Sequence, residues 1–181
     1  MTGHPDNGQR EVIDAPIDVR VVVAAPPGSG KTWTAAERLC RLAEQGSDDD
    51  GGLLALSFSR AAALSLSAHL FRAGVGAKVE VRTIDSWAAR FADNAGRLET
   101  ERFGYENSIA RAVELLANVP DPIEYRHIVV DEAQDIYGAR ATLVEALLCG
   151  GERRGWTVLG DAAQAIYEFD ADDTAHLLRR V

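Results

Sequence analysis

The segment from Ala25 to Thr32 carries residue types that can bind phosphate. It reads Ala-Pro-Pro-Gly-Ser-Gly-Lys-Thr, between an apolar run and an amphipathic stretch. Gly28 and Gly30 permit a turn whose N–H groups point inward, and a helix that begins here adds partial positive charge. We expect Lys31 to reach the β- and γ-phosphates of ATP, and the Thr32 hydroxyl to hold Mg²⁺. The alternative is a glycine-rich turn with an incidental lysine.

Two carboxylates follow a second apolar run, in the block Ile-Val-Val-Asp-Glu-Ala-Gln-Asp that ends at Asp135. Asp131 can hold Mg²⁺ through water, and Glu132 can orient and deprotonate a water molecule beside the γ-phosphate. The alternative is a pair of acids that cap the helix after them. The phosphate loop upstream favours the catalytic interpretation.

A third polar block begins at Gly160 and Asp161, after another apolar run. Gln164 follows closely and could hydrogen-bond the γ-phosphate or its attacking water. Tyr167 and Phe169 lie two residues apart and could stack on unpaired bases. Ordinary core packing is the alternative for these two aromatic side chains.

Short apolar strands that alternate with helical patterns must position these residues. The predicted strands are 19–24, 53–58, 79–82, 127–130 and 156–159. The predicted helices are 31–46, 61–71, 84–91, 108–119, 139–148 and one that begins at Asp172 or Asp173. Residues 92–107 have no clear periodicity. Strand 19–24 has no polar face, as expected of a buried parallel strand.

This alternation predicts an α/β fold, with a mostly parallel central sheet and helices on both faces. Ligands of such sheets bind beyond the carboxyl ends of the strands, which is where the phosphate loop, Asp131 and Asp161 fall. Residues 1–18 are polar, contain Pro5 and Pro16, and are expected to form a flexible segment.

Composition places limits on partners and location. The 181 residues are 46% hydrophobic and 26% charged, the balance of a globular protein. No apolar run reaches the length of a membrane span, and the N-terminus lacks the pattern of a signal peptide. We therefore expect a cytoplasmic protein without a membrane partner. The net charge of −9 argues against DNA binding through bulk electrostatics, but leaves room for a local basic path.

Taken together, the blocks between Gln9 and Phe169 resemble those of UvrD/Rep-type superfamily 1 helicases. The phosphate loop, the Asp-Glu-Ala-Gln-Asp block and the Gly-Asp block match in order and spacing. Three further blocks resemble the family's glutamine motif and its two DNA-contacting motifs: Gly-Gln-Arg-Glu (8–11), Leu-Ser-Phe-Ser-Arg-Ala-Ala (56–62) and Val-Arg-Thr-Ile-Asp-Ser-Trp (81–87).

The resemblance implies a RecA-like P-loop NTPase lobe, a three-layer sandwich over residues 19–181. Such a lobe couples hydrolysis of ATP, bound with Mg²⁺, to movement on single-stranded DNA. It implies catalytic roles for Lys31, Glu132 and Gln164, and Mg²⁺ binding by Thr32 and Asp131. It implies nucleotide binding by Gln9, Pro27, Gly28, Ser29, Gly30, Lys31 and Thr32, with Gln9 reading the adenine. The implied DNA contacts are Phe58, Ser59, Arg60, Thr83, Tyr167 and Phe169.

Several positions depart from the family pattern. Asp85 stands where the family usually has a histidine near DNA, and its carboxylate is expected to repel phosphate. Trp33 and Asp170 stand where arginines are usual. The accessory insertion of many members is reduced to about 92–126. The motifs of a second RecA-like lobe do not follow, so that partner is needed in cis or in trans. We expect weak hydrolysis and no unwinding without it.

Two other functions remain open at this stage. The first is a nucleotide-binding regulatory or interaction module that has lost helicase activity, which the acidic charge, Asp85 and Asp170 favour. The second is another P-loop enzyme, such as a small-molecule kinase. No substrate-binding lid is visible, and a kinase does not account for Gln9 or for the Gly-Asp block with Gln164.

Overall fold

A computed structural model of the chain contains a five-stranded parallel sheet between layers of helices. It describes residues 4–46, 52–95, 105–118, 124–150, 154–161, 177 and 181. The strands are β1 (Arg20–Ala24), β2 (Gly52–Ser57), β3 (Val79–Thr83), β4 (Tyr125–Asp131) and β5 (Gly155–Gly160). The α-helices are α1 (Asn7–Asp14), α2 (Lys31–Gln45), α3 (Arg60–Arg72), α4 (Ile84–Ala95), α5 (Tyr105–Asn118) and α6 (Gly138–Cys149). Two 3₁₀ turns are η1 (Gly76–Lys78) and η2 (Ala133–Asp135).

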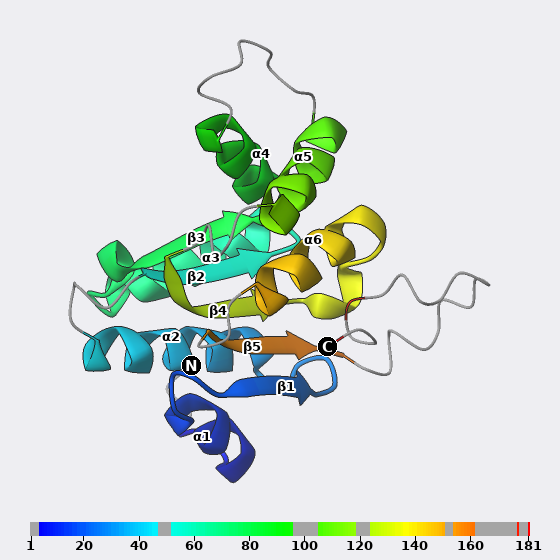
Figure 1. Ribbon diagram of the computed structural model, residues 1–181. Coiled ribbons are helices and arrows are strands. Elements are labelled where there is room, and N and C mark those ends of the chain that lie inside the picture. Colours follow the sequence, from blue (N-terminus) through cyan, green and yellow to red (C-terminus); the bar gives the residue numbers. More distant parts are fainter. Residues whose placement is uncertain are drawn as a thin grey trace.

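The strand order is β1-β5-β4-β2-β3, and every described pairing is parallel (Figure 1). The chain leaves β1 through α2 and reaches β2 past β5 and β4. It leaves β4 through α6 on the opposite face and returns to β5. The crossovers that follow β1 and β4 therefore run on opposite faces, which opens a crevice at the carboxyl ends of these strands.

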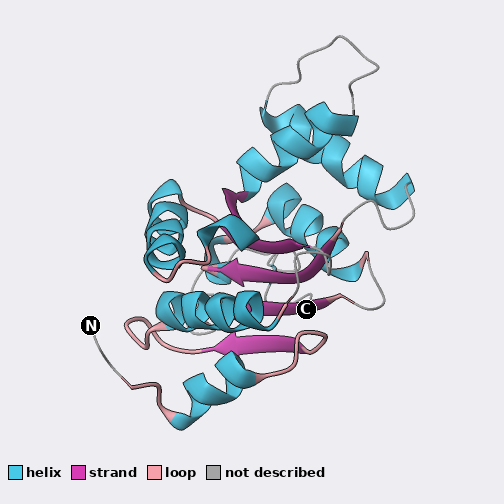
Figure 2. Ribbon diagram, turned by 90° about the vertical axis from the view of Figure 1, so that its left-hand side faces the viewer, coloured by secondary structure: helices cyan, strands magenta, loops and turns pink. Residues whose placement is uncertain are grey.

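Alternate residues of the inner strands face two separate cores. Leu54 and Leu56 of β2 pack with α4, α5 and α6, whereas Leu53 and Ala55 pack with α2 and α3. All four side chains are at most 1% exposed. Helices thus lie on both sides of the sheet (Figure 2), and the predicted three-layer RecA-like architecture is confirmed.

The predicted strands are confirmed within two residues at each end, whereas two predictions about local structure were wrong. Strand β1 is not buried on both faces, because it lies at the edge of the described sheet, where Val22 is 43% exposed. Helix α4 continues to Ala95, and α5 begins at Tyr105, so part of 92–107 is helical. The helix predicted from Asp172 or Asp173 lies outside the described residues.

The second wrong prediction concerns the N-terminal segment, which contains a capped helix, α1. The Asp6 carboxylate accepts a hydrogen bond from the Gln9 backbone N–H at 2.8 Å, and the Gln9 side chain accepts one from the Asp6 N–H at 3.0 Å. These reciprocal bonds satisfy donors that a helix start otherwise leaves unpaired. A reciprocal cap in a short polar segment leaves no hydrophobic periodicity in the sequence.

Arg38 of α2 ties this segment to the sheet from a fully buried position. Its guanidinium donates to the carbonyls of Val12 at 2.7 Å, Ala15 at 2.8 Å and Pro16 at 3.1 Å. Its Nε donates to Thr157 Oγ1 at 2.7 Å. A buried arginine is tolerated when its donors are satisfied, and here they hold the chain between α1 and β1 against α2.

His127 extends this network at the start of β4. Its Nδ1 lies 2.6 Å from the Ile17 carbonyl oxygen, and its Nε2 lies 3.0 Å from Thr157 Oγ1. Because a carbonyl only accepts, Nδ1 carries the proton, and Nε2 accepts from the Thr157 hydroxyl. Burial lowers the pKa of His127 to about 4, which outweighs the opposing hydrogen bond to Ile17. The ring is therefore neutral at pH 7.

We expect acid to destabilise the protein through His127. An unfolded histidine has a pKa near 6.5. Between about pH 6.5 and pH 4 the unfolded state therefore binds more protons than the folded state, in which the pKa of His127 is about 4, and a fall in pH favours unfolding. This contribution is complete above about pH 6.5, and about 2 kcal/mol of it is lost by about pH 5. Urea unfolding between pH 7.5 and pH 5 measures it. In H127Q the loss should shrink, whereas H69Q, which changes a histidine outside this network, should keep it. Equal pH dependence in H127Q and the parent would contradict this account.

Candidate nucleotide site

The phosphate loop lies at the carboxyl end of β1, as predicted. Gly28 and Gly30 have φ of 76° and 84°, the left-handed region that glycine adopts without strain. Thr34 N–H donates to the Gly30 carbonyl at 2.8 Å, so α2 begins directly after the turn. The Ala25 N–H donates to the Gly160 carbonyl at 3.0 Å, which joins the loop to the end of β5.

Lys31 lies over this loop as the first residue of α2. Its Nζ donates to the carbonyls of Ala25 at 2.9 Å and Pro26 at 3.0 Å, and the residue is 9% exposed. The ammonium is thus held above the turn rather than extended into solvent. A pocket of about 320 Å³ opens beside it, lined by Pro27, Gly28, Gly30, Lys31, Thr32, Trp33, Glu132 and Gln134.

Asp131 reaches the same place from the end of β4. It is 1% exposed, and its Oδ1 accepts the Glu132 N–H at 3.0 Å. Burial raises its pKa and Glu132 raises it further, while the Thr32 side chain and Lys31 act in the opposite direction. The sheet thus brings together the loop and the carboxylate that the sequence predicted to converge.

These residues fit a magnesium ion of the kind that accompanies ATP. Asp131 Oδ2 is buried, and no donor among the described residues meets it with hydrogen-bond geometry. The Thr32 hydroxyl is beside this carboxylate, and both are the hard oxygen ligands that Mg²⁺ prefers. Mg²⁺ usually binds one or two protein ligands together with substrate phosphates and water.

Glu132 has an unusual backbone conformation for its residue type. Its φ is 58° and its ψ 42°, and it is the one non-glycine residue with positive φ in the part of the chain that the structure describes. Such strain persists only where the surroundings enforce it, and it is concentrated at functional sites. Here it turns the chain sharply between β4 and η2, so that Glu132 lines the pocket.

Gln134 is a site residue to which the sequence analysis gave no role. Its Nε2 hydrogen-bonds Glu132 Oε2, and its Oε1 accepts the Asp161 N–H at 3.0 Å. One amide therefore orients the Glu132 carboxylate and joins the end of β4 to the end of β5. Its place in the Asp-Glu-Ala-Gln-Asp block was the available signal, but spacing alone did not reveal which atoms it contacts.

Gln9 contacts the phosphate loop from α1. Its Nε2 donates to the Ser29 carbonyl at 3.0 Å, while its Oε1 belongs to the capping box. A Cβ atom on Gly30 would lie 3.1 Å from this amide nitrogen, so glycine also permits the close approach. Gln9 and Ser29 are thus beside the site, and adenine recognition stays a prediction.

The described DNA candidates meet at the carboxyl ends of β2 and β3. These strands are neighbours, with Ser57 opposite Thr83. Phe58 is 38% exposed, and Arg60 is an exposed residue that starts α3. Ser59 caps α3 by accepting the Ala62 N–H at 3.1 Å, and Thr83 Oγ1 accepts the Ser86 N–H at 3.3 Å. Ser59 and Thr83 therefore have structural roles whether or not they bind DNA. Gln164, Tyr167 and Phe169 lie outside the described residues.

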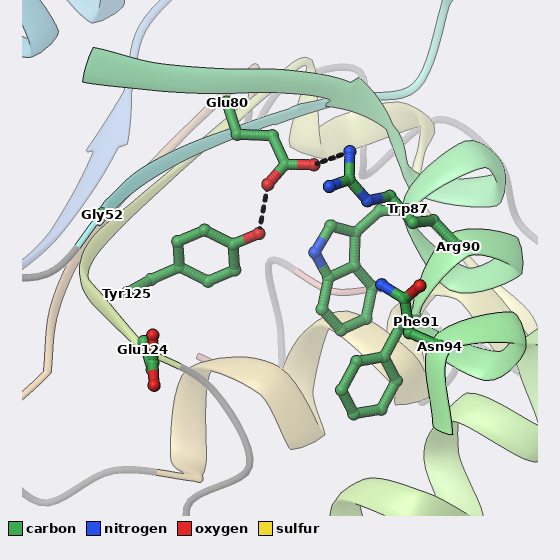
Figure 3. Close-up of a pocket in the computed structure, with 8 residues that line it drawn as sticks. All are labelled: Gly52, Glu80, Trp87, Arg90, Phe91, Asn94, Glu124 and Tyr125. Carbon is green, nitrogen blue, oxygen red and sulfur yellow. Dashed lines mark hydrogen bonds and ion pairs between the residues drawn. The ribbon is translucent and has the colours of Figure 1, made fainter. Parts of the chain in front are cut away.

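Another pocket, of about 370 Å³, is lined by residues at the starts of β2, β3 and β4 and by residues of α4 (Figure 3). The strand residues place it at the end of the sheet opposite to the nucleotide pocket. Tyr125, the first residue of β4, donates to Glu80 Oε2 at 2.5 Å, and Arg82 Nε lies 2.7 Å from Glu80 Oε1. The rings of Trp87 and Phe91 stack at 4.8 Å. Its polar groups thus bond mainly to one another, and its carboxylates would repel a phosphate. We assign it to the packing of α4 against β3 and β4.

The comparison with protein families agrees with this geometry. A family model described as an AAA domain matches residues 9–170. The chain belongs to the AAA domain family. As an AAA domain it is a P-loop nucleotide-binding domain of the helicase type. None of the curated proteins compared with the chain matches it. Among the described residues of this AAA domain, every helix is too short or too polar to cross a membrane.

We expect Lys31→Ala to weaken ATP binding by about 10- to 100-fold, because it removes a charge-assisted hydrogen bond to phosphate. Titration with a fluorescent ATP analogue in the presence of Mg²⁺ measures the affinity. Lys78→Ala is the matched control, because Lys78 has the same charge but donates to the Ala43 carbonyl at the far end of α2. Equal affinities of K31A and K78A would remove Lys31 from the site.

Proposed function

We propose that this AAA domain is the ATP-binding motor lobe of a UvrD-like DNA helicase, which couples ATP hydrolysis to movement on single-stranded DNA. One observation carries the proposal. The nucleotide pocket and the DNA candidates Phe58, Arg60 and Thr83 lie along the same carboxyl edge of one sheet. Helix α2 starts at the nucleotide pocket, and α3 starts at the DNA candidates. We expect a shift of these helices on nucleotide binding to alter the DNA site.

The chain's own residues have distinct roles in the proposed hydrolysis. Lys31 neutralises phosphate charge, and Thr32 and Asp131 would hold the Mg²⁺ that enters with ATP. When bound, that ion would supply Lewis-acid stabilisation of negative charge on the phosphate oxygens. Glu132 accepts a proton from the water whose oxygen forms a bond to the γ-phosphorus, while the bond to the ADP oxygen breaks. Gln134 keeps the Glu132 carboxylate oriented for this step.

The proposed motor needs a second RecA-like lobe, in cis or in trans. In phosphoryl transfer, an arginine supplied by a partner contributes about 10³–10⁵ in rate, because it stabilises charge in the transition state. The resemblance to UvrD-like helicases assigns such arginines to the second lobe. We therefore expect slow hydrolysis by this lobe alone.

We expect Glu132→Gln to retain ATP affinity and to reduce hydrolysis by about 100-fold or more, because the amide cannot accept the proton. A single-turnover assay with labelled ATP measures the rate, and the fluorescent analogue measures the affinity. Glu124→Gln, which removes a carboxylate beside the start of β4, is the control. Full turnover by E132Q would exclude Glu132 as the base.

We expect Arg60→Ala to weaken binding of a single-stranded oligonucleotide and to lower its salt dependence by about one phosphate contact. Fluorescence anisotropy at several salt concentrations measures both. Arg72→Ala is the matched control, because Arg72 ends the same helix at the opposite edge of the sheet.

Regulation or protein binding through the nucleotide site is the second candidate function. The net charge of −9 favours it. Nucleotide-dependent binding to a protein, with no measurable affinity for the oligonucleotide, would support this alternative and contradict the motor.

A further inference from the structure

Asp85 and Arg140 form a two-bond ion pair that neither the nucleotide site nor the fold explains by itself. Arg140 Nε lies 3.0 Å from Asp85 Oδ1, and Arg140 Nη2 lies 3.3 Å from Asp85 Oδ2. The Arg140 side chain is 38% exposed and the Asp85 side chain is 29% exposed. Two parallel bonds between planar groups fix orientation as well as distance, unlike the single contact of a lysine.

The pair joins two helices that continue from the two proposed sites. Asp85 is the second residue of α4 and comes two residues after Thr83, at the end of β3. Arg140 is the third residue of α6, which follows η2 and the nucleotide pocket. Strand β2 lies between β4 and β3, so the ion pair bridges the two helices that follow the strands on either side of β2. Both helices pack on the same face of the sheet.

The dipoles of α4 and α6 act on the two charged groups in opposite directions. A carboxylate in the first turn of α4 is stabilised by the partial positive charge of a helix start. A guanidinium in the first turn of α6 is destabilised by the same effect. The Asp85 carboxylate offsets the unfavourable position of Arg140 at the start of α6. The negative charge of Asp85, which was expected to repel DNA phosphate, is instead neutralised by Arg140.

Packing connects the pair to both sites. Ile84, which precedes Asp85, and Ile136, which precedes α6, are buried in the same core at 1% and 0% exposure. The chain from Ile136 leads back to Gln134, whose amide holds Glu132. A shift of α4 would therefore press on the core beneath the segment that carries the proposed base.

We propose that Asp85 and Arg140 are positioning residues that lock α4 to α6. The lock sets how strongly single-stranded DNA at the Thr83 edge and nucleotide at the Glu132 pocket affect each other's binding. This inference rests on the proposed function. It predicts that the pair controls the coupling between the ligands, and has little effect on either affinity measured alone.

The test compares nucleotide affinity with and without a saturating single-stranded oligonucleotide. The parent protein, D85N, R140Q and the D85N/R140Q double variant are titrated with a non-hydrolysable fluorescent ATP analogue and Mg²⁺. The parent ratio of affinities should be about fivefold or more, in the usual range of coupled sites. Each single variant should bring the ratio close to one, and the double variant should change it no further, because the pair acts as a unit.

Two further variants separate this role from general damage to the fold. The charge swap D85R/R140D restores an opposite pair, and its ratio should recover toward the parent value. E114Q breaks an exposed ion pair within α5, between Arg111 and Glu114 at 2.8 Å, and should leave the ratio unchanged. Thermal unfolding of every variant checks folding, and the swap provides the test if either single variant does not fold.

The possible failures are distinguishable. If the parent couples the two ligands, and D85N and R140Q keep the same ratio, the positioning role is wrong while the motor proposal stands. The same holds if the folded charge swap stays as uncoupled as the single variants. If the parent does not bind the oligonucleotide, or binds it without effect on nucleotide affinity, the proposed function fails and this inference fails with it.

Discussion

The buried carboxylate of Asp131 beside Thr32 and Lys31 is the interaction on which the rest of this structure depends. A carboxylate that is 1% exposed is costly unless charge or donors compensate it. Compensation comes from α2, which presents Lys31 and Thr32 directly after a turn with two left-handed glycines. In the sheet, β5 lies between β1 and β4, so the phosphate loop after β1 and Asp131 at the end of β4 are separated by one strand. The strand order, the glycine turn and the charges of α2 together form the nucleotide pocket.

The polar network around Arg38 fixes the position of α2, the helix that begins at the phosphate loop. It joins α2 to the residues between α1 and β1 and to Thr157 of β5. Gln9 reaches the loop from α1, so the N-terminal segment belongs to the site rather than preceding it. Because the network is buried and its bonds are directional, it fixes relative positions that apolar packing alone would leave adjustable.

The sequence allowed the sheet and the central site to be predicted, because both depend on local patterns. Strands of β-branched and apolar residues, each ending in polar residues, placed Lys31, Asp131 and Glu132 at one edge through the general rule for parallel sheets. Contacts between distant side chains could not be predicted in this way. The roles of Arg38 and Arg140 depend on which elements pack together, and the role of Gln134 depends on β5 lying beside β4. Such information arises only after packing. Asp85 illustrates the difference. Its charge suggested repulsion of DNA, whereas its partner on α6 is 55 residues away.

A crystal structure of the chain with Mg²⁺ and a non-hydrolysable ATP analogue would directly test this nucleotide site. We predict the β-phosphate within the turn at Gly28–Gly30, and Mg²⁺ about 2.1 Å from Thr32 Oγ1. We also predict a metal-bound water on Asp131, and Glu132 facing the γ-phosphate. A triphosphate bound elsewhere, or a metal ion that contacts neither Thr32 nor a water held by Asp131, would contradict this prediction.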